Sequence, residues 1–303
     1  TVASLIDKHA SSAAVRAAMD SPRGYDEALW SLLCEQVGVA ALVVPEEFGG
    51  AGGELADAAA VLEELGRALV PTPLLGTTLA ELALLAADEP DSDTVEQLAA
   101  GVAIGAVVFD RDYVVNGDVA DVVVAVEDAR LVRWSDVSAE AVSTVDPTRR
   151  LARVTPGTTE TIGTDPGIAD TAAILLAAEQ VGAASRCLEL TVDYTKERVQ
   201  FGRPIGSFQA LKHRMADLYV AVQSARAVVG DAIAEPTASS AALARLAASE
   251  AFTTVAGEAI QLHGGIAITW EHDIQLYFKR AHGSAQLLGP PREQLRRLES
   301  EVF

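Results

Sequence analysis

The sequence predicts a mainly α-helical protein with a short β segment in its middle. Half of the residues are apolar, mostly Ala, Val and Leu, and only 5% are aromatic, a mixture that favours helix over strand. Apolar residues recur at helical spacing in the first hundred residues, form short Val-rich runs after Gly101, and return to helical spacing from Ile168. We therefore expect three units in this chain of 303 residues: an N-terminal helical domain over 1–100, a reduced β domain over 101–160 and a C-terminal four-helix bundle over 161–303.

Helices joined by turns are expected throughout the N-terminal unit. Apolar residues repeat there at i, i+3 and i+4, and the stretches between the repeats carry Gly or Pro, which interrupt helices. The run PEEFGGAGG at 45–53 contains two Gly pairs and is expected to form a loop. The expected helices cover 29–37, 54–69, 77–87 and 94–100.

From Gly101 to about Thr155 the chain has the composition of strands and hairpins. Short Val-rich runs alternate there with Asn-Gly and Glu-Asp-Ala turns. A β segment of about 55 residues suffices for one small sheet but is short for a closed barrel. The next stretch, TPGTTETIGTDPG at 155–167, has the composition of a linker.

Four long helices are expected after this linker. Pro236 separates the second from the third, and Gly-Gly and Gly-Pro-Pro runs end the third and the fourth. Two long helices joined by a connection of about seven residues lie antiparallel, which gives a bundle. The expected helices cover 168–194, 208–229, 240–262 and 273–288.

The net charge and the placement of the Cys and His residues indicate which ligands, partners and metal ions this chain can bind. The chain has 23 Lys and Arg against 43 Asp and Glu, and its net charge of −20 repels phosphate backbones, so no nucleic-acid partner is expected. A local Arg or a helix N-terminus can still hold a small anionic cofactor. Cys34 and Cys187 stand alone, which favours buried thiols. The histidines His213, His263 and His272 lack a metal-ligand spacing, so no metal site is expected.

The sequence also indicates where the protein works. The first 20 residues lack a basic region followed by an apolar run, so they do not resemble a signal peptide. No stretch reaches the roughly 18 uncharged apolar residues of a membrane helix. We therefore expect a cytoplasmic protein without membrane contact.

Two stretches of the C-terminal unit are more specific than the rest. The first, YTKERVQFGRPIGSFQALKHRMADL at 194–218, contains Arg-x-x-Phe-Gly and, after a loop, Phe-Gln. The second, EAIQLHGGIAITWEHDIQLYFKRA at 258–281, contains Gln-x-x-Gly-Gly. In this order, on adjacent helices of an all-α unit, the two patterns resemble the C-terminal domain of the acyl-CoA dehydrogenase family. The loop PEEFGGAGG is similar to the form usual in the N-terminal domain of that family.

This resemblance implies that the chain holds the adenosine-pyrophosphate half of an FAD molecule. Arg offers a charge-assisted fork to a diphosphate, and an aromatic ring packs on adenine. Gln amides reach ribose and phosphate oxygens, and Gly lets the backbone approach an anion. Taken one at a time, these residue types more often serve as helix-end cations, core aromatics or helix stops. The cofactor-binding residues that the resemblance implies are Arg198, Gln200, Phe201, Phe208, Gln209, Gln261, Gly264 and Gly265.

Two features that this family needs are missing from the sequence. Neither the Thr-Glu-Pro-x-x-Gly-Ser-Asp stretch nor the Trp-x-Thr stretch that grips the isoalloxazine ring is present. The family places its carboxylate base in a Glu-Gly after the fourth bundle helix, where this chain has Leu288-Gly289, or on the first bundle helix, at Ala172. No catalytic residue is therefore assigned. Glu271 and Glu179 are the remaining candidates for a base, and Glu271 is the better one.

Both gaps indicate a subunit that works with a fuller partner. The chain resembles the smaller subunit of the heterotetrameric α2β2 acyl-CoA dehydrogenases of actinobacterial steroid side-chain degradation. The resemblance implies that a larger subunit supplies the flavin pocket, the base and most of the acyl-CoA site. Two alternatives stay open: a self-sufficient homo-oligomeric dehydrogenase with Glu271 as base, and a non-enzymatic helical scaffold subunit that has lost FAD.

Overall fold

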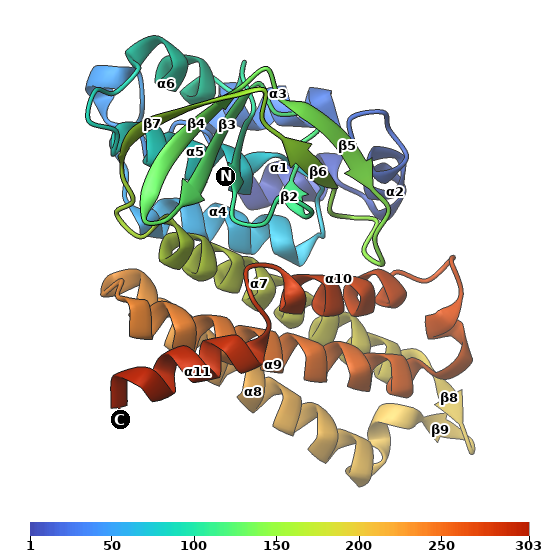
Figure 1. The fold of residues 1–303 in the computed structure, drawn as a ribbon. Coiled ribbons are helices and arrows are strands. Elements are labelled where there is room, and N and C mark those ends of the chain that lie inside the picture. The colour runs from blue at the N-terminus through green and yellow to red at the C-terminus, as the bar shows by residue number, and fades with distance from the viewer. Residues whose placement is uncertain (303) are drawn as a thin grey trace.

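The computed structural model describes residues 1–302 and the side chains up to residue 299, so Phe303, the last residue of the expected bundle, lies outside it. Figure 1 shows the N-terminal helices and the strands in one half of the molecule and the long C-terminal helices in the other. Helix α7 (Ile168–Glu197) lies where the two halves meet, against α4 (Leu55–Arg67). The mainly helical fold class is confirmed.

The N-terminal helices begin and end where the sequence offers caps. Asp26 accepts two backbone hydrogen bonds at the start of α3, and Gly38 ends that helix at a φ of 71°, in the left-handed region. Glu54 and Asp57 form a reciprocal capping box at the start of α4. The four expected helices are α3 to α6, whereas α1 and α2 were not predicted. The bounds are α1 (Val2–His9), α2 (Ser12–Met19), α3 (Glu27–Val37), α4 (Leu55–Arg67), α5 (Leu74–Leu85) and α6 (Ser92–Ala99), with a 3₁₀ turn at Glu46–Phe48.

The β segment forms two sheets, so the expectation of one small sheet is wrong. The first has the order β1-β3-β4-β7 and the second the order β2-β6-β5. Apolar side chains from both sheets share one buried cluster, which includes Val123, Trp134 and Val154. The residues of β3 are apolar on both faces, so a single exposed sheet would leave one face in water. The strands are β1 (Gly105–Val108), β2 (Val114–Val115), β3 (Val122–Glu127), β4 (Arg130–Ser135), β5 (Ser138–Val142), β6 (Leu151–Thr155) and β7 (Thr158–Thr164).

The expected linker at 155–167 is also wrong, because most of it is strand β7. This strand pairs antiparallel with β4, with Trp134 opposite Thr159 and Arg130 opposite Thr164. Its first four residues are exposed, so it carries the polar composition of a linker. β-branched Thr nevertheless favours an extended backbone. The expected boundary at 160 lies inside strand β7, which ends at Thr164. The division of the chain into units at 100 and 160 stays a prediction.

The C-terminal half contains the four expected helices and one more. Helix α11 follows α10 after a short turn and packs on α9. Helix α10 ends before the Gly-Pro-Pro run, as expected, and Pro291 of that run also begins α11, because Pro fits the first helical position. None of the described helices is long and apolar enough to span a bilayer. The bounds are α7 (Ile168–Glu197), α8 (Gln209–Ala234), α9 (Ala238–His263), α10 (Ile274–Gln286) and α11 (Pro291–Val302), with the short strands β8 (Val199–Gln200) and β9 (Arg203–Pro204) between α7 and α8.

Glycines let α4 and α7 cross closely. A Cβ on Gly66 would lie 2.2 Å from the backbone oxygen of Glu179, and one on Gly182 would lie 2.0 Å from that of Glu63. Any larger residue at either position would push the helices apart. One apolar cluster therefore runs without a break from the N-terminal helices into α7.

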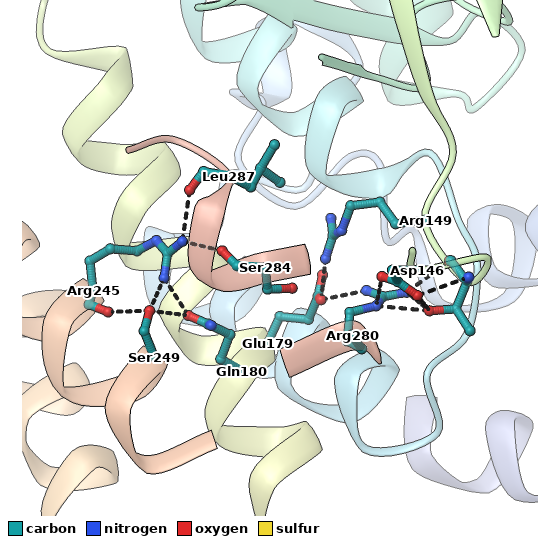
Figure 2. A network of polar contacts seen from close by, with 10 residues as sticks. Asp146, Arg149, Glu179, Gln180, Arg245, Ser249, Arg280, Ser284 and Leu287 are labelled. Carbon is teal, nitrogen blue, oxygen red and sulfur yellow. Dashed lines mark hydrogen bonds and ion pairs between the residues drawn. The ribbon is translucent and has the colours of Figure 1, made fainter. Parts of the chain in front are cut away.

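Deep in the bundle, a buried arginine holds the end of α10 (Figure 2). Arg245 is 1% exposed, and its guanidinium donates to Gln180 Oε1 at 2.8 Å and to the Leu287 carbonyl at 2.7 Å. It also donates to Ser249 Oγ and to the Ser284 carbonyl. Burial lowers the pKa of Arg245 to about 10, so the group stays charged at neutral pH. It satisfies carbonyls that the last turn of α10 leaves without a helical partner.

Glu81 of α5 is a buried carboxyl whose stability contribution can be tested. It is 0% exposed, and neither carboxyl oxygen has a hydrogen-bond partner among the described residues. Burial raises its pKa well above 4.5. The group is therefore tolerated below pH 4.5 and destabilises the fold as pH rises through its raised pKa.

We expect Glu81→Leu to raise the midpoint of thermal unfolding, by about 2–4 °C for each kcal/mol gained. The gain should be larger at pH 7.5 than at pH 5, as measured by circular dichroism. Glu89→Gln, at an exposed position, is the matched control and should not change the midpoint. A Glu81→Leu variant that melts below the wild type at both pH values would contradict this prediction.

Candidate functional site

The ends of α7 and α9 meet at one corner of the molecule. The rings of Tyr194 and His263 stack with their centroids 4.2 Å apart, and the Tyr194 hydroxyl donates to the His263 carbonyl at 3.3 Å. Arg198 follows Tyr194 by one helical turn, and Gly264 directly follows His263. Figure 1 shows β8, β9 and the end of α9 at this corner, on the side away from strands β1 to β7. The structure thus brings together the two motifs that the sequence singled out.

A tight hairpin projects from this corner. Its strands β8 and β9 are joined by Phe201, at a φ of 53°, and Gly202, at a φ of 76°. The Phe201 side chain is 92% exposed and meets the Phe208 ring edge-on, with 6.2 Å between the centroids. The Arg203 guanidinium covers Phe208 at 3.9 Å from the ring centroid. Phe201 therefore offers a free aromatic face, whereas Phe208 is partly covered within the chain.

The glycine turn at the end of α9 is open to solvent. Gly264 has a φ of 64°, which favours glycine, and a Cβ there would meet nothing within 4 Å. A Cβ on Gly265 would also meet nothing, and Gly265 is not among the residues with positive φ. Nothing within the described chain therefore requires a glycine at position 265. A ligand that approaches the backbone from outside would provide a reason.

The remaining candidates share this open surface. Arg198 forms no ion pair with a carboxylate among the described residues, and Gln200 Nε2 donates to the neighbouring Val199 carbonyl at 3.0 Å. The start of α8, next to this surface, has no side-chain cap. The candidates form a surface and not a closed pocket. Arg198, Gln200, Phe201, Gln209, Gln261, Gly264 and Gly265 are exposed and Phe208 is half-buried.

Neither candidate base has the environment of a general base. Glu271 is exposed, and hydrogen bonds from its own backbone N–H and from Thr269 lower its pKa. Burial opposes ionisation of Glu179, but the positive charges of Arg149 and Arg280 outweigh it and lower the pKa. A base that works near neutral pH usually has a raised pKa.

Glu179 belongs instead to a buried ion-pair network between the two halves of the chain (Figure 2). It pairs with Arg149 and, at 2.6 Å, with Arg280 Nη1. Arg280 also contacts Asp146 at 2.8 Å and donates to the Thr148 carbonyl at 2.7 Å. The cavity beside this network has a volume of about 20 Å³, enough for about one water. Neither a flavin ring nor a thioester fits there.

Sequence reasoning missed both the ion-pair network and the Tyr194–His263 stack. Their members lie far apart in the chain, and Arg149 and Arg280 stand in stretches with no distinctive spacing. Tyr194 lies one turn before Arg198 on the same helix, but this spacing alone does not indicate a partner on α9. Among the described residues, no group of three or more His, Cys, Asp or Glu is placed to hold a metal ion.

Comparison with known proteins identifies the family. The family model for the acyl-CoA dehydrogenase N-terminal domain matches residues 1–101, and the model for the C-terminal domain matches residues 167–299. The chain belongs to the acyl-CoA dehydrogenase family. It is similar to acyl-CoA dehydrogenase IpdE2 of Mycobacterium tuberculosis, at 73% identity over 303 residues that cover 100% of this chain and 95% of that protein. It is 70% identical to IpdE2 of Mycolicibacterium smegmatis, over 100% of this chain and 97% of that protein.

Solved acyl-CoA dehydrogenases have the same fold. A variant of the Tcur3481-Tcur3483 steroid ACAD superposes with a TM-score of 0.89 at 28% identity, over 99% of this chain and 95% of that one. A chain of the ChsE4-ChsE5 complex from Mycobacterium tuberculosis superposes with a TM-score of 0.88 at 25% identity, over 99% of this chain and 94% of that one.

FAD is the cofactor of this acyl-CoA dehydrogenase family member. The open corner fits one end of that molecule. A diphosphate needs cations and free backbone N–H groups, which Arg198 and the uncapped start of α8 offer, and the Gly264 turn leaves open space beside its backbone. An adenine needs an aromatic face, which Phe201 offers.

The structural role of Glu179 gives a testable contrast with Glu271. We expect Glu179→Gln to lower the free energy of unfolding by about 3–5 kcal/mol, because it leaves the buried Arg149 guanidinium without its counter-charge and Arg280 with Asp146 alone. Because the folded pKa of Glu179 is lowered, its contribution is present above pH 4.5 and is lost as pH falls through the folded pKa. The difference from wild type should therefore shrink in acid.

Urea unfolding followed by circular dichroism at pH 7.5 and pH 4 measures this difference. Glu271→Gln is the control, because its carboxylate is exposed and should leave the unfolding midpoint unchanged. Equal midpoints for the Glu179→Gln variant and the wild type at pH 7.5 would show that the network adds no stability.

Proposed function

We propose that this chain is the smaller subunit of a heteromeric acyl-CoA dehydrogenase. In this proposal it holds the adenosine-pyrophosphate half of FAD, and a larger partner subunit supplies the flavin pocket, the catalytic base and most of the acyl-CoA site. The observation that carries the proposal is the contrast between two parts of the chain. The corner at Arg198 and Gly264 is open, whereas the interior at Glu179 is filled by ion pairs.

Each residue of the open corner has a role in this proposal. Arg198 pairs with the diphosphate, and the backbone at Gly264-Gly265 approaches it closely. Phe201 packs on the adenine, with Phe208 behind it at 6.2 Å. The amides of Gln200, Gln209 and Gln261 reach ribose and phosphate oxygens. When bound, FAD supplies the flavin ring that accepts a hydride from the β-carbon of the acyl thioester.

Two positions support the assignment of the base to the partner. Leu288 and Gly289, after α10, stand where the family has a Glu-Gly, and Ala172 stands at the alternative position on α7. Ala172 is fully buried, and the cavity at Glu179 has room for about one water. The described residues offer no carboxylate with a raised pKa at either place. α,β-Dehydrogenation therefore needs a base from outside this chain.

The similar solved structures support the substrate class and the kind of partner. One is described as a steroid ACAD with two named components, and another is a ChsE4-ChsE5 complex. We infer that this chain assembles with a larger acyl-CoA dehydrogenase subunit into an α2β2 heterotetramer in the cytoplasm. The substrate in this proposal is the CoA thioester of a steroid side chain.

We expect Arg198→Ala to weaken FAD binding by the assembled complex by about 2–3 kcal/mol, because it removes a charge-assisted fork to the diphosphate. That loss corresponds to a dissociation constant about 30–150-fold higher. Arg198→Lys should recover part of the affinity, because ammonium keeps the charge but not the planar fork. Flavin fluorescence during titration of the apo-complex with FAD measures both.

Arg130→Ala is the control, because Arg130 is an exposed cation on β4 and far along the chain from the corner. Unchanged FAD affinity in the Arg198→Ala complex would contradict the proposal that this corner binds FAD and would favour the scaffold alternative. Flavin absorbance and acyl-CoA turnover by the chain purified alone, lost on Glu271→Gln, would instead establish the self-sufficient alternative.

A further inference from the structure

Three aromatic side chains from different elements meet beside the turn 264–272. Besides its stack on Tyr194, the imidazole of His263 meets that of His272 edge-on, with 4.8 Å between the centroids. His272 also lies edge-on to Tyr194 at 6.3 Å. His263 is buried and His272 is half-buried. Through these contacts the two ends of the turn are held to each other and to α7.

Both imidazoles make hydrogen bonds that require neutral rings or specific tautomers. Nδ1 of His263 lies 2.8 Å from the Ala259 carbonyl and must carry the proton, because a carbonyl oxygen only accepts. Nδ1 of His272 accepts from the Ile274 N–H at 3.2 Å, so its lone pair must be free. His272 therefore caps the start of α10, where the N-cap residue Asp273 makes no side-chain cap.

The Asp273 carboxylate contacts helix α2 and not the backbone of α10. Its Oδ1 accepts from Ser12 Oγ at 2.6 Å and from Arg16 Nη2 at 2.8 Å. These bonds fasten α2 to the start of α10. Asp273 therefore does not cap α10, and the hydrogen bond from the Ile274 N–H to His272 is a side-chain cap at the start of this helix.

The turn between these ends has few interior contacts of its own. Its large apolar side chains are exposed: Ile266 is 46%, Ile268 75% and Trp270 62% exposed. The Trp270 ring lies against Lys279 Nζ at 3.9 Å, and Ala267 is buried. The conformation of the turn therefore depends strongly on how its ends are held.

We propose that His263 and His272 are positioning residues that keep the Gly264-Gly265 turn in its FAD-binding conformation only while both imidazoles are neutral. Acidification would then release FAD from the complex. This inference rests on the proposed function, in which that turn receives the FAD diphosphate.

A proton on His272 removes the acceptor of the Ile274 N–H group. It also places a positive charge at the start of α10, where the helix dipole is already positive. Arg16 of α2 opposes that charge, whereas Asp273 favours it. Burial lowers the pKa of His272 and outweighs the attraction of Asp273.

A second proton, on His263, would place two cations side by side. The imidazole centroids are 4.8 Å apart, a distance at which like charges in a partly buried site repel strongly. Burial lowers the pKa of His263, and His272 lowers it further. Both rings are therefore neutral at pH 7. Each imidazole takes up its proton at a pH below the usual histidine pKa of about 6.5.

Titration of the apo-complex with FAD at pH 7.5 and pH 5.5 tests this inference, with flavin fluorescence as the readout. We compare the wild type with His272→Asn, because the Asn side-chain oxygen can accept from the Ile274 N–H and does not titrate. In the wild type, one linked proton should weaken binding about tenfold for each pH unit below the imidazole pKa. In the His272→Asn complex, the ratio of dissociation constants between the two pH values should fall several-fold.

His9→Asn, at an exposed position on α1, is the matched control and should keep the wild-type ratio. Equal ratios for His272→Asn and the wild type would overturn the inference. If His272→Asn does not assemble, hydrogen exchange of the wild-type complex decides. Protection at residues 264–274, corrected for intrinsic rates, should fall between pH 7.5 and pH 5.5, and unchanged protection would overturn the inference. Failure of the proposed function is distinguishable, because Arg198→Ala would then retain FAD at pH 7.5.

Discussion

The structure depends on how helix α7 satisfies its two adjacent polar residues in the interior. Glu179 and Gln180 lie where α7 passes between the two halves, and both are buried. Glu179 forms ion pairs with Arg149 and Arg280, and Gln180 accepts a hydrogen bond from Arg245 (Figure 2). An unpaired charge or amide at this depth would destabilise the fold by several kcal/mol. These arginines thereby fix the segment between β5 and β6, α10 and α9 against one helix.

The same arrangement closes one part of the molecule and leaves another open. The ion pairs fill the space around Glu179, and the cavity beside them has room for about one water. At the far end of α7, the Tyr194 stack joins α7 to α9 without covering Arg198 or the glycine turn. A closed interior and an open corner on one chain suit a subunit whose cofactor site is completed by another polypeptide.

Most helices could be predicted from the sequence, because their periodicity and caps are local. The starts of α3 and α4 follow from Asp26 and Glu54, which satisfy backbone groups within one turn. Strand β7 could not be predicted, because its polar, exposed residues resemble a linker and its pairing with β4 is decided by contacts distant in sequence. Helix α11 was missed because a Pro pair can end one helix or begin the next.

The sequence by itself determined the family resemblance and the residue types of the candidate half-site, because those motifs are short and contiguous. The tertiary structure alone decided what surrounds them. Glu179 was a candidate base by its chemistry, and only the approach of Arg149 and Arg280, 30 and 101 residues away, made it a structural anion. Burial, charge pairing and access are set by residues that meet only after the chain folds, so no local pattern could have revealed them.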